Sequence, residues 1–365
     1  MKYFIIAGEA SGDLHGANLI KSIKQKDDSA QFNFWGGDKM ASQAQGLLMH
    51  YKNVSIMGFV EVLMNLHSIF ANLDLCKKQI SVFKPDVVIL IDFPGFNLRI
   101  AEFCKSKGIK VVYYISPKVW AWKENRAKKL EKYVDILLLI FPFEVDYFKK
   151  WNLKTAYVGN PLMDEIQQFS HNPLFREQNL LSEKPIIALL PGSRKQEIKS
   201  TLPLMIKLAS TYPNYQFLVA GAPSISKEFY ESYEHENVKI IYNQAYDILS
   251  QSTAAIVCSG TATLETALFN IPQVCAYVAH PISYMIAKML VNIKYISLVN
   301  LNLNREAICE LIQSDFNESR LKLEFEAILP KGSKRDTLLI EYAKLRNLFG
   351  VGASDKAASE IMKLL

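Results

Sequence analysis

The sequence predicts an α/β protein with two doubly wound, Rossmann-like domains that face a cleft. Short, wholly apolar runs alternate with amphipathic segments, which is typical of parallel strands covered by helices on both faces. This pattern occurs twice, on either side of a stretch rich in Pro, Asn and Ser between Gly159 and Pro185. The length of 365 residues also suits two domains, because one domain commonly takes about 100–200 residues.

The first half contains the clearest strand candidate, Val87–Ile91, which consists of apolar residues only and is followed directly by Asp92. Its other strand candidates are Tyr3–Ala7, Gln31–Trp35, Lys110–Ile115 and Ile136–Ile140. A glycine-containing loop and a helix that ends near Lys24 follow the first of these candidates. We therefore expect an N-terminal domain over residues 1–165.

The second half repeats this organisation over residues 166–335. Its strand candidates are Ile186–Leu190, Tyr215–Ala220, Val238–Tyr242, Ala254–Cys258 and Gln273–Tyr277, and helices are expected near 202–212, 246–251 and 261–270. Residues 336–365 have the composition of a helical tail that Gly350 and Gly352 divide into two pieces. The sequence leaves open whether this tail packs back on the N-terminal domain or is swapped between two chains.

Charge and cysteine content restrict the class of protein. Lys and Arg exceed Asp and Glu by 42 to 36, and the net charge of +6 favours anionic ligands or an anionic membrane surface over a dedicated nucleic-acid binder. The 5 cysteines form no CxxC pair, so we expect a reducing, cytoplasmic environment. We find neither a signal peptide nor an apolar run of the roughly 20 residues needed to cross a membrane. The histidine spacing predicts no metal site.

Two loops of the first half follow strand candidates and have the residues of a functional site. The loop from Gly8 to Gly16 can approach a ligand closely and leads into a helix N-terminus, which favours anions; a strand–helix turn with Asp13 as the N-cap is the alternative. Asp92 ends a buried strand, where partial loss of water raises a carboxyl pKa toward that of a general base. Asn97 is expected to cap the next helix, which leaves Asp92 without a structural task.

Two further segments of this half are unusual. Trp120, Trp122 and the basic residues after them form a solvated helix face, a nucleic-acid surface or an interfacial membrane or lipid-phosphate site. The segment 57–70 has an apolar helical stripe and, outside it, three more apolar residues, Met57, Val60 and Met64. This surplus indicates a lipid groove, a membrane surface or a dimer contact; a helix buried on two sides is the alternative.

Two loops of the second half are predicted to bind phosphate. We expect Ser193 and Gln196 to form a capping box, which places the positive charge of Arg194 against the helix dipole; a phosphate contact would explain that charge, and a surface arginine is the alternative. After the strand 254–258, the backbone amides of 260–263 can bind a pyrophosphate. Glu265 lies one helical turn further on and could reach ribose hydroxyls, or it could simply stabilise the helix dipole.

Taken together, eight segments resemble those of the lipid-A-disaccharide synthase family, a bacterial, membrane-associated glycosyltransferase family. In order along the chain these segments are AGEASGD (7–13), MGFVEVL (57–63), KPDVVILIDFPGFN (84–97), YYISPKVWAWKENR (113–126), FPFE (141–144), VGNPL (158–162), LLPGSR (189–194) and SGTATLE (259–265). The resemblance extends from about residue 3 to Gln313, and the last ~50 residues match weakly.

The resemblance implies a two-domain glycosyltransferase-B fold and a specific reaction. UDP-2,3-diacylglucosamine and 2,3-diacylglucosamine-1-phosphate would give a β-1,6-linked disaccharide-1-phosphate and UDP, with inversion and with neither a metal nor another cofactor. The enzyme would associate peripherally with the anionic inner face of the cytoplasmic membrane, without a nucleic-acid partner, and a homodimer is left open. The alternative functions are a UDP-sugar 2-epimerase of the same fold and a non-catalytic basic and aromatic module that binds a membrane or RNA.

The resemblance also implies the roles of individual residues. Asp92 would be the catalytic base, with Glu9 as the second candidate. The UDP-binding residues would be Arg194, Ser259, Gly260, Thr261, Thr263, Glu265, Asn300 and Arg305. The residues for the acceptor and the lipid would be Ser11, Met57, Val60, Met64, Trp120, Trp122, Lys123 and Arg126. The chain departs from the family at Gly95, where an acid is common, and at Asn304, where glycine is common and where a left-handed turn would tolerate Asn.

Overall fold

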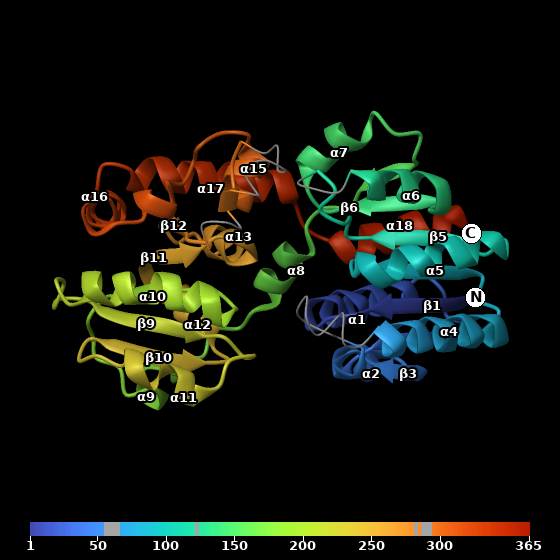
Figure 1. The fold of residues 1–365 in the computed structure, drawn as a ribbon, viewed down its shortest axis with the longest axis horizontal. Coiled ribbons are helices and arrows are strands. Elements are labelled where there is room, and N and C mark those ends of the chain that lie inside the picture. The colour runs from blue at the N-terminus through green and yellow to red at the C-terminus, as the bar shows by residue number, and fades with distance from the viewer. Residues whose placement is uncertain (55–65, 121–123, 281–283, 286–293) are drawn as a thin grey trace. The chain divides into compact units, whose positions relative to one another are not determined.

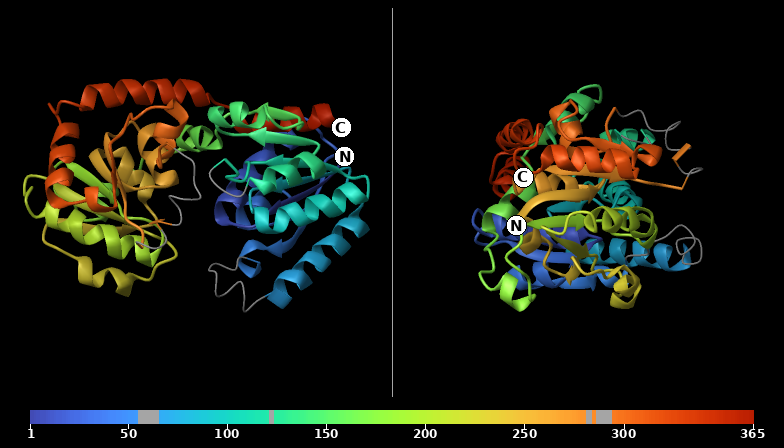
Figure 2. Two further views of the ribbon diagram at one scale, coloured as in Figure 1. Left: turned by 45° about the horizontal axis from the view of Figure 1, so that its top comes forward. Right: turned by 90° about the vertical axis from the view of Figure 1, so that its left-hand side faces the viewer.

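The computed structural model describes residues 1–54, 66–120, 124–280, 284–285 and 294–365. The chain forms two compact units, and each contains one parallel sheet with helices on its faces (Figures 1 and 2). Unit 1 comprises Met1–Asp164 and Phe349–Leu365, and unit 2 comprises Glu165–Leu348. The predicted fold class, two doubly wound α/β domains, is confirmed.

The sheet of unit 1 has 7 parallel strands in the order β3-β2-β1-β4-β5-β6-β7. These strands are β1 (Lys2–Ala7), β2 (Gln31–Gly36), β3 (Leu47–His50), β4 (Val87–Ile91), β5 (Lys110–Tyr114), β6 (Ile136–Leu139) and β7 (Thr155–Tyr157). The five predicted strands are confirmed, and the short edge strands β3 and β7 were not predicted. The strand order reverses between β1 and β4, and such a switch point is where open α/β sheets bind ligands.

Helices cover both faces of this sheet because its strands are apolar on both sides. Alternate strand residues, such as Phe4 and Ile6 of β1 and Val88 and Leu90 of β4, belong to one core cluster with α4, α5 and α6. The helical segments of unit 1 up to Asp164 are α1 (Ala10–Lys24), α2 (Asp38–Gln43), η1 (Tyr51–Asn53), α4 (Leu66–Phe83), α5 (Pro94–Ser106), α6 (Asn125–Tyr133), α7 (Pro142–Phe148) and the first half of α8 (Pro161–Gln168). None of the described helices is both long and apolar enough to cross a bilayer.

The sheet of unit 2 has 6 parallel strands in the order β10-β9-β8-β11-β12-β13. These strands are β8 (Ile186–Leu190), β9 (Gln216–Gly221), β10 (Val238–Tyr242), β11 (Ser252–Cys258), β12 (Gln273–Tyr277) and β13 (Glu310–Ile312). The first five were predicted to within about two residues at their ends, which is the usual uncertainty of element boundaries. The order reverses between β8 and β11, so this unit has its own switch point.

The helices of unit 2 differ from the prediction mainly at one place. They are α9 (Phe175–Gln178), α10 (Lys195–Ala209), α11 (Lys227–Tyr230), η2 (Glu231–Tyr233), α12 (Ala245–Ser250), α13 (Thr261–Leu268), α15 (Leu298–Leu303), η3 (Gln313–Asp315), α16 (Glu318–Ile328) and α17 (Arg335–Phe349). The helix that we expected from residue 202 begins at Lys195 and accommodates Pro203 in its interior. Consequently one continuous helix leads away from the loop that follows β8.

The C-terminal segment is divided between the two units. Helix α17 belongs to unit 2 up to Leu348, whereas α18 (Ala353–Leu364) belongs to unit 1 and packs beside α1. Gly350 and Gly352, with φ of 61° and 77°, form the break between these helices. Because α18 packs on unit 1 of its own chain, the structure has the packed-back arrangement, and a swap between chains stays untested.

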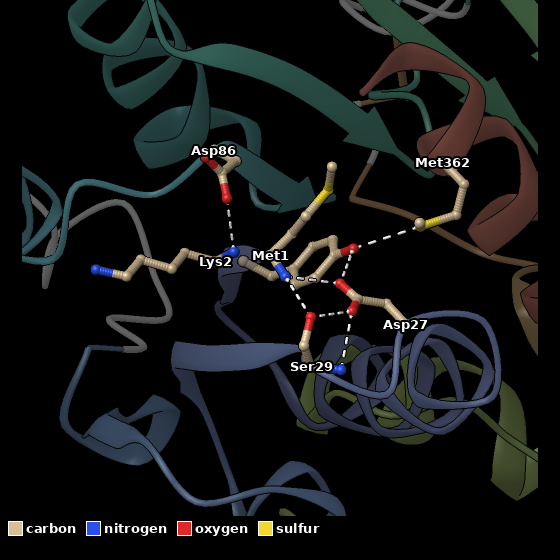
Figure 3. Close-up of polar contacts among 7 residues, drawn as sticks. Met1, Lys2, Asp27, Ser29, Asp86 and Met362 are labelled. Carbon is tan, nitrogen blue, oxygen red and sulfur yellow. Dashed lines mark hydrogen bonds and ion pairs between the residues drawn. The ribbon is translucent and has the colours of Figure 1, made fainter.

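Polar contacts at both ends of α18 attach it to unit 1. Asp164 accepts a hydrogen bond of 2.6 Å from the Gly352 amide, just before the first turn of α18. Near the other end, the Tyr3 hydroxyl lies 3.3 Å from the sulfur of Met362 and donates to Asp27 at 3.0 Å. Figure 3 shows Met362 beside this cluster, in which Asp27 also pairs with the N-terminal ammonium group at 2.9 Å.

Candidate active site

In unit 1, charged side chains gather where β1, β4 and β5 end. Glu9 follows β1, Asp92 follows β4 and Lys118 follows β5, while His15 lies on the first turns of α1. The carboxyl ends of parallel neighbouring strands meet at one edge of a sheet, so these groups lie close enough for their charges to interact. The charges of Glu9, Lys118 and His15 all influence the ionisation of Asp92.

The ionisation of Asp92 is the most distinctive property of this cluster. Asp92 remains exposed on one side of its loop, but the protein groups around its carboxyl displace part of its water and raise its pKa to about 6, and the negative charge of Glu9 contributes to the rise. The positive charge of Lys118 and the backbone amide of Phe93 oppose it. At neutral pH Asp92 is therefore mostly a carboxylate, but a stronger base than an ordinary aspartate.

The backbone at Asp92 is strained. Asp92 and Phe93 have φ of 44° and 47°, so two successive residues other than glycine are left-handed. Such conformations cost about 1–3 kcal/mol per residue and persist only where the surroundings stabilise them. They place the Asp92 side chain in the turn between the end of β4 and the start of α5.

Asn97 and Tyr113 stabilise this turn. The Asn97 amide donates to the carbonyl oxygens of Ile91 at 3.2 Å and Asp92 at 2.8 Å, and the Tyr113 hydroxyl donates to the Asp92 carbonyl at 2.6 Å. The expectation that Asn97 caps the following helix is wrong, because α5 begins at Pro94 and its N-cap is Phe93. Asn97 is fully buried and stabilises the turn that presents Asp92.

The loop after β1 also differs from the prediction. Helix α1 begins at Ala10 with Glu9 as its N-cap, so Asp13 is not the N-cap of α1. The buried Asp13 carboxylate instead accepts from the amides of Gly37 at 2.6 Å and Met40 at 3.1 Å, and so caps α2. Gly8 is required for close approach, because a Cβ there would lie 2.4 Å from the Phe93 ring. The two loops of unit 1 are thus in contact.

In unit 2, the loop after β11 presents backbone amides. Gly260 has φ of 158° and ψ of −160°, a conformation that is essentially restricted to glycine, and no atom lies within 4 Å of the place of a Cβ. The Ser259 hydroxyl donates to the Ile296 carbonyl at 3.0 Å, and the Thr263 hydroxyl donates to the Gly260 carbonyl at 2.8 Å. The first turn of α13, which begins at the exposed Thr261, has backbone amides without partners inside the helix.

The loop after β8 places Arg194 beside an acid. The predicted capping box of Ser193 and Gln196 is wrong, because Arg194 is the N-cap of α10 and Glu197 is its third residue. The Glu197 carboxylate accepts from the Ser193 amide at 3.0 Å and pairs with the Arg194 guanidinium at 2.8 Å. The Arg194 side chain is 80% exposed, so an anion could compete with Glu197 for it.

Glu265 belongs to a cluster of carboxyl groups in unit 2. Burial raises the pKa of Glu265 to about 7, and the carboxylate of Glu165 on α8 contributes, whereas a hydrogen bond with Tyr246 lowers it. Neither Glu165 nor Tyr246 was predicted from the sequence. Both lie far from residue 265 along the chain, and neither stands in a pattern that marks a site.

Asn300 and Arg305 have internal partners. The buried Asn300 amide donates to the Ile308 carbonyl at 2.9 Å and to Glu310 at 2.8 Å, and its oxygen accepts from the Ala307 amide at 2.8 Å. Asn300 therefore stabilises the connection from α15 to β13, and direct contact with a nucleotide stays a prediction. Arg305 is half-exposed and pairs with Glu341 at 2.7 Å.

Two other expectations about residues of the chain can be followed in the structure. Asn304 has φ of 52°, so the left-handed turn that we expected at this departure from the family is confirmed.

The Trp120 ring packs edge-on against Phe143, at 4.9 Å between ring centroids, so this side chain is a packing residue of unit 1. Glu144 is buried beside Trp120, and this burial raises the pKa of Glu144 to about 8.

The remaining predicted site residues fall into two groups. Ser11 is exposed on the first turn of α1, and Arg126 is half-buried on α6. The others lie outside the described residues: Met57, Val60, Met64, Trp122 and Lys123. Within the ranges that the structure describes, no group of three or more His, Cys, Asp or Glu side chains could bind a metal ion.

Comparison with known proteins identifies the family. A family model described as lipid-A-disaccharide synthetase matches residues 3–362, well beyond Gln313, where the resemblance in motifs ended. The lipid-A-disaccharide synthase of Myxococcus xanthus is 35% identical over 373 residues, covering 100% of this chain and 97% of that protein. The enzyme of the same name from Syntrophus aciditrophicus is 36% identical over 371 residues, covering 99% and 97%.

Solved structures show the fold alone. The UDP-GlcNAc 2-epimerase from Neisseria meningitidis bound to UDP-GlcNAc aligns with a TM-score of 0.67 and 14% identity over 100% of both chains. A glycotransferase of kitacinnamycin aligns with a TM-score of 0.66 and 11% identity over 99% of this chain and 98% of the other. Both likenesses agree with the glycosyltransferase-B fold that the sequence predicted.

Proposed function

The chain belongs to the lipid-A-disaccharide synthetase family of glycosyltransferases, and from this we propose that it joins UDP-2,3-diacylglucosamine to 2,3-diacylglucosamine-1-phosphate. The products would be the β-1,6-linked disaccharide-1-phosphate and UDP. Family membership sets aside the two alternatives, a UDP-sugar 2-epimerase and a non-catalytic binding module. The observation that carries the proposal is Asp92, a partly desolvated carboxylate with a pKa of about 6 at the switch point of unit 1.

We propose that Asp92 acts as the general base. Its carboxylate would take the proton of the acceptor 6-hydroxyl while that oxygen attacks the anomeric carbon of the donor. The new C–O bond forms as the bond between the anomeric carbon and the UDP oxygen breaks, and attack from the opposite face inverts the configuration. Glu9 supports this role because its negative charge strengthens Asp92 as a base.

We propose that unit 2 binds the leaving diphosphate. The backbone amides at the start of α13 and the guanidinium of Arg194 would stabilise its negative charge, so we propose that no metal is required. Arg194 would exchange its pairing with Glu197 for a phosphate oxygen. The Glu265 carboxyl group would form hydrogen bonds with the ribose hydroxyls.

We further propose that the enzyme works at the inner face of the cytoplasmic membrane. Each buried CH₂ of an acyl chain is worth about 0.8 kcal/mol, so substrates with long acyl chains hardly leave a bilayer. Lys128 and Lys129 are exposed on α6 and would attract anionic lipids. Charge reversal at both residues should weaken salt-sensitive co-sedimentation with anionic vesicles, and unchanged co-sedimentation would contradict a contact at this face.

The test of the reaction is an assay with purified protein, labelled UDP-2,3-diacylglucosamine and the monosaccharide-1-phosphate lipid, with and without EDTA. We expect formation of the disaccharide-1-phosphate at the same rate in both arms. Consumption of the UDP-sugar without acceptor would instead indicate an epimerase. A loss of activity in EDTA that Mg²⁺ restores would refute the metal-independent mechanism.

A further inference from the structure

A pocket in unit 1 lies beside the Asp92 turn and has a strongly basic lining. It has a volume of about 340 Å³ and lies between the N-terminal parts of α5 and α6. Arg99 of α5 and Arg126 and Lys129 of α6 line it, and none of its described lining residues is acidic. Positive charges that face one small pocket repel one another, and an anion bound there would relieve this repulsion.

Among the described residues, nearby acids do not neutralise Arg99 or Lys129. Within the described part of the chain, neither Arg99 nor Lys129 has an ion-pair partner, and the Arg99 guanidinium donates only to the Gly95 carbonyl. Glu124, which directly precedes α6, pairs with Lys150 instead. Gly95, which also lines the pocket, has no atom within 4 Å of the place of a Cβ. This wall of the pocket is therefore open and uncharged.

The starts of the two helices add to the positive character of the pocket. Neither α5, with 13 residues, nor α6, with 9, has a side-chain hydrogen bond at its N-cap. Pro94 has no amide hydrogen, and the Phe96 and Ala127 amides donate to backbone carbonyls, so Gly95 and Asn125 supply first-turn amides next to the cations. A small, doubly charged anion with several oxygens, such as a phosphate monoester, matches this lining.

The pocket is close to the proposed base. Its lining residues Pro94 and Gly95 follow Asp92 by two and three positions. The Tyr113 hydroxyl donates to the Asp92 carbonyl at 2.6 Å. The charges of both Asp92 and Arg126 influence the pKa of Tyr113. A ligand bound in the pocket would therefore lie next to the Asp92 turn.

We propose that this pocket binds the 1-phosphate of the acceptor lipid and thereby orients its 6-hydroxyl toward Asp92. The inference rests on the proposed function. In the acceptor sugar, the phosphate is on C1 and the nucleophilic oxygen is on C6, and one ring oxygen joins C1 to C5, which bears C6. Phosphate and nucleophile are thus within one sugar of each other, as the pocket and Asp92 are neighbours. The donor has no phosphate monoester, so the pocket also distinguishes acceptor from donor.

The test compares Arg99→Gln/Lys129→Gln with the control variant Lys107→Gln/Lys132→Gln. The control removes two charges outside the pocket, since Lys107 follows the end of α5 and Lys132, in the last turn of α6, does not line the pocket. In detergent micelles we expect the pocket variant to raise the KM for the acceptor by about 10- to 100-fold, which is about 1.4–2.8 kcal/mol for both contacts together, because solvent weakens the contacts of exposed charges. The KM for the donor should not change.

An acceptor without its phosphate gives the specific readout. The wild type and the control should use it with a raised KM, and the pocket variant, which keeps Arg126, should distinguish the two acceptors by a smaller factor than the wild type does. An equal acceptor KM in the wild type and the pocket variant would overturn the inference. If, in addition, only the pocket variant lost binding to phosphatidylglycerol vesicles, the pocket would serve membrane headgroups instead.

A binding measurement separates this inference from the proposed reaction. The affinity for glucosamine-1-phosphate, measured by calorimetry, should be weakened in the pocket variant and unchanged in the control. If the wild type makes no disaccharide, the proposed function fails, and this affinity alone decides the inference. Equal affinity in the wild type and the pocket variant would then refute it.

Discussion

The loops after β4 and β11 differ in how they present chemical groups, although each leads from a buried strand into a helix. After β4, two left-handed residues, Asp92 and Phe93, are stabilised by side-chain hydrogen bonds from Asn97 and Tyr113. After β11, a single residue, Gly260, makes the turn with open space around it. The first loop orients a side chain, and the second exposes a backbone.

This difference follows from what each proposed task requires. A general base must be oriented toward one proton, and a strained turn that neighbours stabilise restricts its position. A diphosphate must come close to several amides at once, which any Cβ in the turn would hinder. The same strand–loop–helix unit can therefore serve opposite tasks through a few residues of its turn.

The largest effect is expected at the side chain of the first loop. Asp92→Asn should lower kcat by about 10²- to 10⁴-fold, because the amide cannot accept the proton of the acceptor hydroxyl. The affinity for UDP, measured by calorimetry, should stay the same. Asp74→Asn, on the exposed surface of α4, is the matched control and should leave kcat unchanged. Near-normal turnover of Asp92→Asn would move the base to Glu9.

The next largest effect is expected at the backbone of the second loop. Gly260→Ala should weaken UDP binding by roughly 10- to 100-fold, because alanine strains this turn by about 1–3 kcal/mol and displaces its amides. Gly108→Ala is the control, since Gly108 also has positive φ, at 71°, and open space. Gly108→Ala should lose comparable stability in thermal unfolding but retain UDP affinity. Equal UDP affinity in both variants would show that this turn does not bind the diphosphate.

A smaller effect is expected from a change in Asn97, which supports the Asp92 turn but leaves Asp92 itself unchanged. Asn97→Ala removes two hydrogen bonds from the strained turn and should lower kcat on the order of 10-fold, with about 1–3 kcal/mol lost in unfolding free energy. Asn179→Ala removes an asparagine of unit 2 that also donates to a carbonyl, that of Phe175 at 2.9 Å. Its kcat should be normal. A normal kcat in Asn97→Ala as well would refute the positioning role.

The smallest effect concerns pH. The kcat/KM of the wild type should fall as pH drops through about 6, because Asp92 must be ionised to accept a proton. Glu9→Gln removes a charge that raises the pKa of Asp92, so this acid limb should move to lower pH; Lys118→Gln should move it to higher pH. We expect shifts on the order of half a pH unit in profiles of kcat/KM. Shifts of the same sign in both variants would exclude Asp92 as the titrating group.

The sequence predicted most of the fold because wholly apolar strands such as Val87–Ile91 are visible without any partner. The edge strands β3, β7 and β13 escaped prediction because they are short and only partly buried. Their neighbours in the sheet come from other parts of the chain, so the local sequence pattern does not reveal the pairing. Fold class thus follows from local pattern, whereas sheet edges follow from tertiary pairing.

The sequence identified loops after strands as the place of the candidate site, but it misassigned polar residues whose partners lie outside their own helix. Asp13 and Asn97 have the side chains of helix caps, yet each bonds to backbone groups that the fold brings near: Asp13 to Gly37 and Asn97 to Ile91. Glu197 replaced Gln196 because α10 begins one residue later than the capping-box spacing assumed. Glu165 had no local signal, since only the fold places it beside Glu265.

The bond between Asp164 and Gly352 has a consequence for biosynthesis. Residues 353–364 complete unit 1, but the ribosome makes them only after all of Glu165–Leu348. During translation the nascent first unit therefore lacks the helix that buries part of α1, and its apolar surface there stays uncovered until unit 2 has emerged. Aggregation of truncated chains and a need for chaperones should consequently originate at α1, the part of the first unit that is made early and covered last.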